Sequence, residues 1–133
     1  MTKQGTLGFA LLAGVAGLVS GCQTWGPTWS ELTGENWNKA ISWREPAIIE
    51  RVDGKTPDTS SRPIRVEPGK ARVLTISPVN SARRVSGWRL MEMTLDIEPC
   101  KRYFINAQFT GPRDPDFTPV VDRVETISGC KVP

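Results

Sequence analysis

Two consecutive runs of alternating residues restrict what this chain can fold into. The sequences MEMTLDI at 91–97 and YFINAQF at 103–109 place an apolar residue at every second position. Side chains of a strand point alternately to its two faces, so this period predicts two strands that each bury one face. A third run at 120–127 follows a Gly-Pro break and the turn-forming sequence DPD. We expect the three runs to form an antiparallel meander.

The upstream half of the chain adds three shorter runs. Residues 47–52 end in an Asp-Gly turn, residues 64–66 lead into a Pro-Gly turn, and residues 72–76 resume as a strand. Short strands separated by turns are typical of sandwiches. The sequence therefore predicts an all-β fold, a small immunoglobulin-like β-sandwich of about six or seven strands.

The N-terminus has the parts of a secretory signal. Lys3 is followed by an apolar run at 7–19, which is shorter than the about 20 residues that span a bilayer. The run closes on Val-Ser-Gly-Cys at 19–22, which resembles the lipobox of bacterial lipoproteins. That resemblance implies cleavage after Gly21 and a diacylglycerol and N-acyl (palmitate-type) lipid on Cys22. The alternative is an ordinary signal peptide followed by a chance cysteine.

The residue after the lipobox bears on the destination. Position 23 is Gln rather than Asp. By the sorting rule of enteric bacteria, this resemblance implies the periplasmic face of the outer membrane rather than retention in the inner membrane.

Lipidation of Cys22 leaves two of the three cysteines, Cys100 and Cys130. In an oxidising compartment a lone pair is expected to form a disulfide. A loop of about 30 residues closed in this way stabilises a fold by roughly 3–4 kcal/mol. A metal site or a redox pair is the alternative, but the chain has no histidine and the spacing is not CxxC.

These features divide the chain into three parts. We expect a signal peptide at 1–21, a lipidated tryptophan-rich arm at 22–43 and a disulfide-stapled sandwich at 44–133. Thr28 and Glu31 have the spacing of a capping box, which favours a broken helix in the arm. An extended arm lying over the sandwich is equally compatible.

The arm holds four of the five tryptophans. Trp25, next to the anchor, either seats the N-terminus at the membrane interface or is an exposed tether residue. Trp29, Trp37 and Trp43 either fill the core or form a partner interface.

The central stretch is basic, with Arg62, Arg65, Arg72 and Arg84 as its candidate binding residues. Such a stripe binds an anionic envelope polymer, either lipopolysaccharide or an acidic glycan, or it is simply a solvated sheet face.

Composition argues against several function classes. Without Lys3, 16 of the 17 basic residues remain against 14 acidic ones, and this balance does not indicate a nucleic-acid partner. The chain has no histidine and no GxSxG or SxxK motif, so we do not expect an enzyme. Asp114 and Asp116 indicate a turn rather than a calcium loop. No metal or cofactor is expected apart from the covalent lipid.

Four short sequences together resemble those of small proteobacterial outer-membrane lipoproteins to which no activity is assigned. They are PAII at 46–49, VEPG at 66–69, EPCKRY at 98–103 and Gly-Cys at 129–130. The expected function is that of a lipid-anchored, non-catalytic interaction module of an envelope complex. Binding of an anionic envelope polymer through the basic residues is the alternative.

Overall fold

A computed structural model describes residues 26–58, 63–77 and 89–133, where the chain is all-β. No helix occurs in these ranges, so none of them contains a helix long and apolar enough to cross a membrane. The all-β prediction is confirmed, with eight strands instead of the six or seven expected. The strands are β1 (Ser30–Thr33), β2 (Arg44–Pro46), β3 (Ile48–Val52), β4 (Ile64–Val66), β5 (Gly69–Ile76), β6 (Leu90–Ile97), β7 (Lys101–Gln108) and β8 (Thr118–Thr126). Four candidate residues lie outside the described ranges: Cys22, Trp25, Arg62 and Arg84.

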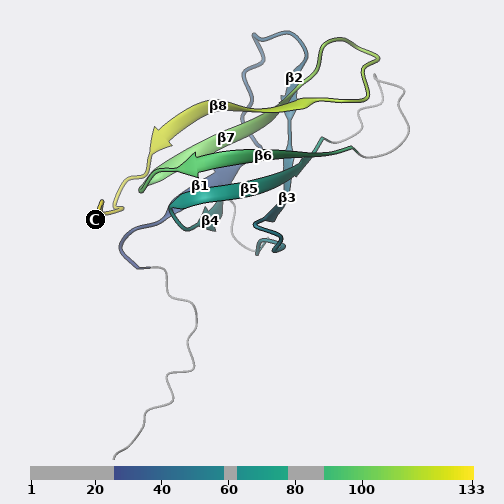
Figure 1. The fold of residues 1–133 in the computed structure, drawn as a ribbon. Helices are drawn as coiled ribbons and strands as arrows, with labels where there is room; N and C mark the ends of the chain where they lie inside the picture. Colours follow the sequence, from purple (N-terminus) through teal and green to yellow (C-terminus); the bar gives the residue numbers. More distant parts are fainter. Residues whose placement is uncertain (1–25, 59–62, 78–88) are drawn as a thin grey trace, which may run out of the picture.

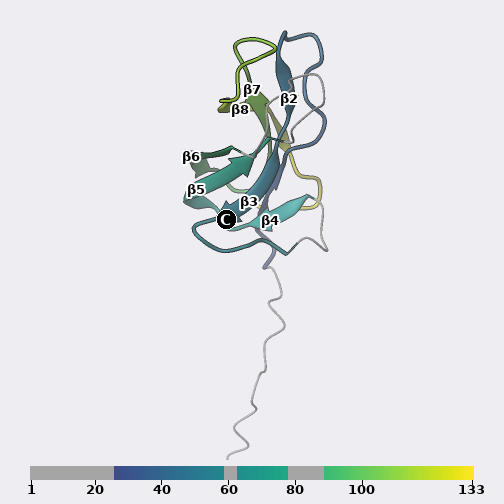
Figure 2. The ribbon, with the colours of Figure 1, turned by 90° about the vertical axis from the view of Figure 1, so that its right-hand side faces the viewer.

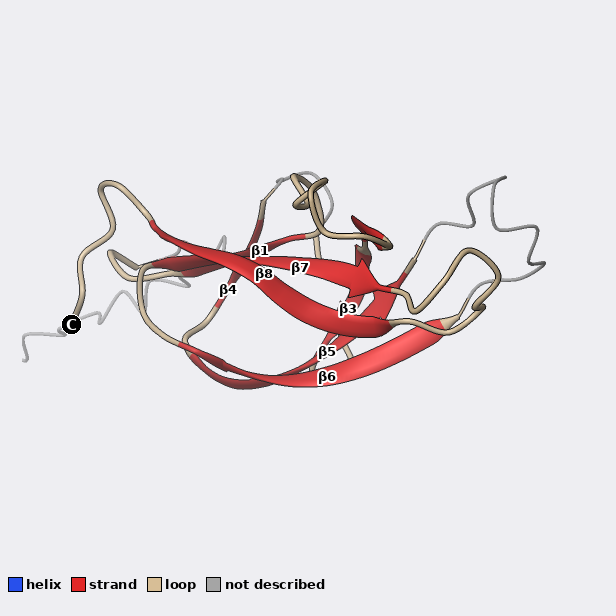
Figure 3. Cartoon of the chain, turned by 90° about the horizontal axis from the view of Figure 1, so that it is seen from above, coloured by secondary structure: helices blue, strands red, loops and turns tan. Residues whose placement is uncertain are grey.

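The strands form two sheets packed as a sandwich, visible as two layers in Figure 3. Sheet A contains β2, β7, β1, β4 and β8, and sheet B contains β3, β5 and β6. In sheet A, β8 pairs antiparallel with the whole length of β7. The opposite edge of β7 is shared by two short strands, β1 in parallel and β2 in antiparallel orientation. Strand β7 is therefore the centre of sheet A.

The predicted meander is wrong for its first strand. Strand β6 pairs with β5 in sheet B, whereas β7 and β8 pair antiparallel in sheet A, as expected. The chain changes sheets at residues 98–100, where the Tyr103 hydroxyl accepts a hydrogen bond from the Glu98 amide at 2.8 Å. A period of two predicts which face of a strand is buried, but it does not predict which strand lies beside it.

Part of the predicted arm is a strand of the sandwich. All four residues of β1 are buried, and β1 lies between β7 and β4. The Ser30 hydroxyl donates to the Glu98 carbonyl at 2.6 Å, and the Glu31 carboxylate accepts from Arg102 at 2.6 Å. These partners allow a polar segment to be buried. The sandwich thus begins with β1, ahead of the expected boundary at 43/44, and the described part of the arm has no helix.

Strands β2 and β3 are one stretch of chain that passes from sheet A to sheet B at Ala47. The Ala47 amide donates to the Gly34 carbonyl at 3.3 Å. A Cβ atom at Gly34 would lie 1.5 Å from the Ala47 carbonyl oxygen. Only glycine fits at this position, because any side chain would overlap with backbone.

The core lies between the sheets. Its main cluster includes Leu32, Val73, Ile105 and Tyr103, and a smaller cluster surrounds Phe109. The residues of the core come from both sheets, as expected for a sandwich.

The two ends of the described chain meet beyond β8. Cys100 and Cys130 form a disulfide, which confirms the predicted pair. The Lys131 amide donates to the Pro27 carbonyl at 2.9 Å, so the first described residues and the C-terminus lie together (Figure 1). We call this the disulfide end of the sandwich.

Candidate interaction surface

The loop between β1 and β2, residues 34–43, lies at the end of the sandwich opposite the disulfide. It is seen beside the β7–β8 connection, residues 109–117, at the top of both Figure 1 and Figure 2. We call this the distal end. It follows from the topology, because β1 and β7 run in parallel away from the disulfide end.

The carboxylate of Asp122 is one of the groups that hold the 34–43 loop. A shift of register between β7 and β8 leaves Asp122 as an extra residue, a β-bulge. Its carboxylate accepts from Arg44 Nη1 at 2.5 Å and from the Asn38 amide at 2.7 Å. Arg44 Nε also donates to the Gln108 side chain at 2.8 Å. The side chains of Arg44 and Asp122 are 12% and 5% exposed, so this ion pair is well shielded from water.

The held loop presents apolar side chains to solvent. Trp43 is 46% exposed and Ile41 is 37% exposed. The ring of Trp37 lies partly buried, with the Lys39 ammonium 5.2 Å from its centroid. Exposed aromatic and aliphatic groups on one loop are a feature of binding surfaces. We refer to Trp37, Ile41 and Trp43 as the distal surface.

The backbone of Trp43 is in the left-handed region, with a φ of 61°. A bulky residue in that region is an outlier, and its surroundings must hold it there. The Phe109 amide donates to the Trp43 carbonyl at 3.0 Å, and the Gln108 side chain donates to the Ser42 carbonyl at 3.0 Å. The end of β7 therefore fixes the backbone that carries the exposed indole.

Within the described ranges, no tryptophan belongs to the buried core. Trp29 is partly buried at the disulfide end, where its indole N–H donates to Glu31 at 3.2 Å and Arg65 stacks 4.9 Å from the ring centroid. Trp29 thus lies at the opposite end of the sandwich from Trp37 and Trp43. The three tryptophans, expected to act together in the core or in one interface, are divided between the two ends.

The structure does not bring the two described candidate arginines together. Arg65 lies on β4 in sheet A, and Arg72 lies on β5 in sheet B. Arg72 donates to the Glu92 carboxylate at 3.1 Å, and this hydrogen bond together with the carboxylate charge raises the pKa of Arg72. Arg65 stacks on Trp29 instead. In the described part of the chain the basic residues do not form one stripe.

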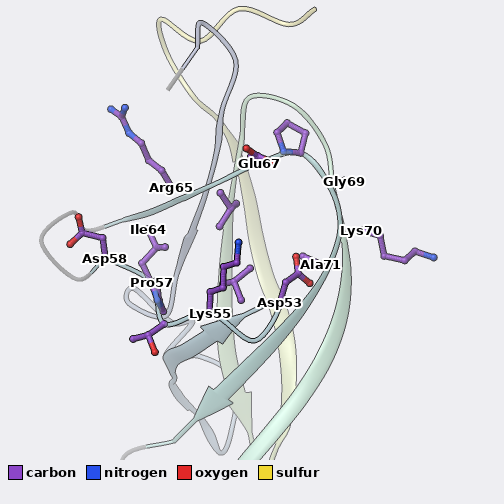
Figure 4. Close-up of a pocket in the computed structure, with 14 residues that line it drawn as sticks. Asp53, Lys55, Pro57, Asp58, Ile64, Arg65, Glu67, Gly69, Lys70 and Ala71 are labelled. Carbon is purple, nitrogen blue, oxygen red and sulfur yellow. The ribbon is translucent and has the colours of Figure 1, made fainter. Parts of the chain in front are cut away.

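A cleft of about 650 Å³ lies between the end of β3 and the β4–β5 turn (Figure 4). Lys55 extends into the cleft, while Arg65 and Lys70 point away from it on opposite sides. The Asp53 carboxylate accepts from the Arg72 amide at 2.8 Å, so it is already engaged. The charges around this cleft are mixed in sign and do not converge on one class of ligand.

No group of three His, Cys, Asp or Glu side chains in the described ranges is placed to hold a metal ion. The residues that sequence reasoning missed are Asp122 and Arg44, which position the distal loop. No local signal singles out Asp122, because the run at 120–127 also contains Arg123 and Glu125.

No family model, curated protein or solved structure matches this chain.

Proposed function

We propose that the protein is a non-catalytic interaction module, lipid-anchored through Cys22 to the periplasmic face of the outer membrane. It serves as an accessory subunit of an envelope complex. The distal surface contacts the protein partner. The observation that carries this proposal is the exposure of Trp43 and Ile41 on the loop at the distal end. Residue 26, where the described chain begins, lies at the opposite end of the sandwich (Figure 2).

This arrangement suits a tethered binder. A lipid on Cys22 holds the disulfide end toward the bilayer, so the distal end faces away from it. Confinement to a surface raises the effective concentration of the module, and weak contacts are then sufficient. The loop is already ordered by Asp122 and the end of β7, which lowers the entropy lost on binding.

The experiment is photo-crosslinking in intact cells from the distal loop. A photoreactive amino acid replaces Trp43 in the full chain, and captured proteins are identified by mass spectrometry. The matched control carries the same group at Val132, which is 70% exposed at the disulfide end. We expect one specific envelope protein from position 43 and not from position 132.

The same cells report on the anchor. The wild-type chain should fractionate with the outer membrane, and a Cys22→Ala chain should become soluble in the periplasm and lose most of the crosslink. Unchanged membrane fractionation of the Cys22→Ala chain refutes the anchor. Equal capture from positions 43 and 132 refutes the distal surface.

A further inference from the structure

The outer face of sheet B differs from that of sheet A. In β5 the residues Ala71, Val73 and Thr75 point into the core and are buried. The residues between them, with their neighbours on β3 and β6, form an outward surface that we call the sheet-B face. On sheet A, by contrast, the outward side chains Phe104 and Asn106 are buried.

The sheet-B face is divided along its strands. Toward the distal end, Ile76 lies directly between Ile48 on β3 and Leu90 on β6. Ile48 is 45% exposed and Leu90 is 56% exposed, so this row of aliphatic side chains is largely open to solvent. A row of three aliphatic residues across a sheet is an apolar patch.

Toward the disulfide end the same face is charged, with one sign on each strand. Lys70 and Arg72 lie on β5, and Asp96 and Glu92 lie on β6. Lys70 is directly opposite Asp96, and Arg72 contacts Glu92 at 3.1 Å. The face therefore has a basic column beside an acidic column and an apolar row above both.

We propose that the sheet-B face binds the sheet-B face of a second copy of this chain. The two copies are related by a two-fold axis that runs parallel to β5 and β6 and passes between them. Each β5 then faces the other copy's β6. Lys70 meets the second copy's Asp96, and Ile76 meets the second copy's Leu90.

The charge pattern selects this axis over the others. An axis running along β5 would place Lys70 and Arg72 against the same residues of the second copy, which is repulsive. An axis perpendicular to the strands would place the apolar row against the charged end, which leaves charges desolvated. Of these three axes, only the chosen one sets the basic column against the acidic column, with Lys70 level with Asp96, and Ile76 against Leu90, as an isologous interface requires.

The area of the face suggests a weak contact. The two strands that overlap about this axis, β5 and β6, have eight residues each and span roughly 26 Å by 10 Å, which is less than a stable interface of about 800 Å² per partner needs. Appreciable pairing thus rests on the proposed anchoring, which concentrates the copies on one membrane. The chosen axis also places both disulfide ends on the same side, as two copies anchored in one bilayer require.

Two charge-reversing substitutions, Lys70→Glu and Asp96→Lys, test the proposal, each alone in both copies and then one in each copy. Lys70→Glu in both copies places a new carboxylate against Asp96, and Asp96→Lys in both copies places two ammonium groups together. A mixed pair, one copy with each change, restores two attractive contacts between the copies. It does not restore the contact within either chain, so rescue reports only the contact between copies.

The readout is crosslinking in cells of the full anchored chain. A photoreactive amino acid at Thr94 of one copy captures a second copy that carries an epitope tag. The control has this group at Thr118, an exposed position on β8 of sheet A. We expect capture from position 94 of wild type, a loss of about tenfold in either uniform variant, and recovery in the mixed pair.

Two results would overturn the proposal: capture from position 94 that is no greater than from position 118, or a mixed pair captured no better than the uniform variants. Membrane fractionation of the same cells separates this failure from a failure of the anchor. An intact Cys100–Cys130 disulfide in each variant shows that it has folded.

Discussion

At the scale of single residues, Gly34 fixes the point where the chain turns from one sheet to the other. It lies at the end of β1, and its carbonyl accepts the Ala47 amide where β2 becomes β3. The absence of a side chain allows two backbone segments to approach directly. The distal loop begins at this contact, so its geometry depends on it.

Gly34→Ala should destabilise the fold by about 3 kcal/mol, because the added Cβ would overlap the Ala47 carbonyl oxygen and the backbone would have to move. Urea unfolding followed by tryptophan fluorescence measures the difference. Gly111→Ala is the control, since a Cβ there meets nothing within 4 Å, and it should change stability by about 0.5 kcal/mol at most. Equal stabilities of the two variants would contradict the steric account.

At the scale of elements, the strands that sequence reasoning found and missed differ in a physical way. Strands β6 and β7 were predicted because alternation over eight residues leaves a strong pattern. Strand β1 was missed because Ser30–Thr33 contains one large apolar residue, and its burial depends on polar partners more than 60 residues away. Such partners leave no trace in the local sequence.

The remaining differences have the same origin. Strand β2 is three residues long and ends in Pro46, so no periodicity could show. The disulfide was predictable by counting, because setting aside Cys22, the expected site of lipidation, leaves only two cysteines. The distal surface was predicted only as a group of tryptophans. That Trp43 is exposed while Trp29 stacks on Arg65 follows from tertiary contacts.

Asp122→Ala should loosen the 34–43 loop, because it removes the acceptor of the Asn38 amide and leaves the shielded Arg44 without its carboxylate. Breaking such a pair costs about 3 kcal/mol. Hydrogen exchange should rise at residues 36–43, and the unfolding midpoint should fall.

A carboxylate in an exposed ion pair is the matched control. Asp116 lies 3.6 Å from Arg89, with both side chains more than half exposed. Asp116→Ala should therefore change stability by about 0.5 kcal/mol or less and leave exchange in the loop unaltered. A similar loss of stability in both variants would contradict the role given to Asp122 in holding the loop.

At the scale of the whole molecule, the disulfide closes the end where both chain termini of the described sandwich meet. It links the residue before β7 to the segment after β8, and Cys100 also donates its amide to the Trp29 carbonyl at 3.0 Å. One covalent bond thus supports contacts of β1, β7 and β8 together.

Replacing both Cys100 and Cys130 by alanine should lower the free energy of unfolding by about 3–4 kcal/mol, because the unfolded chain regains the freedom of a loop of about 30 residues. Thermal unfolding of the oxidised wild-type chain, with and without reductant, should show a loss of similar size. If reductant leaves the unfolding temperature unchanged although thiol labelling shows both cysteines free, the stabilising role is refuted.

The parallel pairing of β1 with β7 also has a kinetic consequence. Strand β1 pairs only with residues 64–66 and 102–104. The first strand of the described chain therefore cannot pair until distant residues have come next to it. A topology dominated by such long-range pairs folds slowly. Until those residues have reached β1, the strand has no partner, so the sandwich closes late in folding. On the proposed export and acylation at Cys22, this delay would leave both steps time to occur before the sandwich closes.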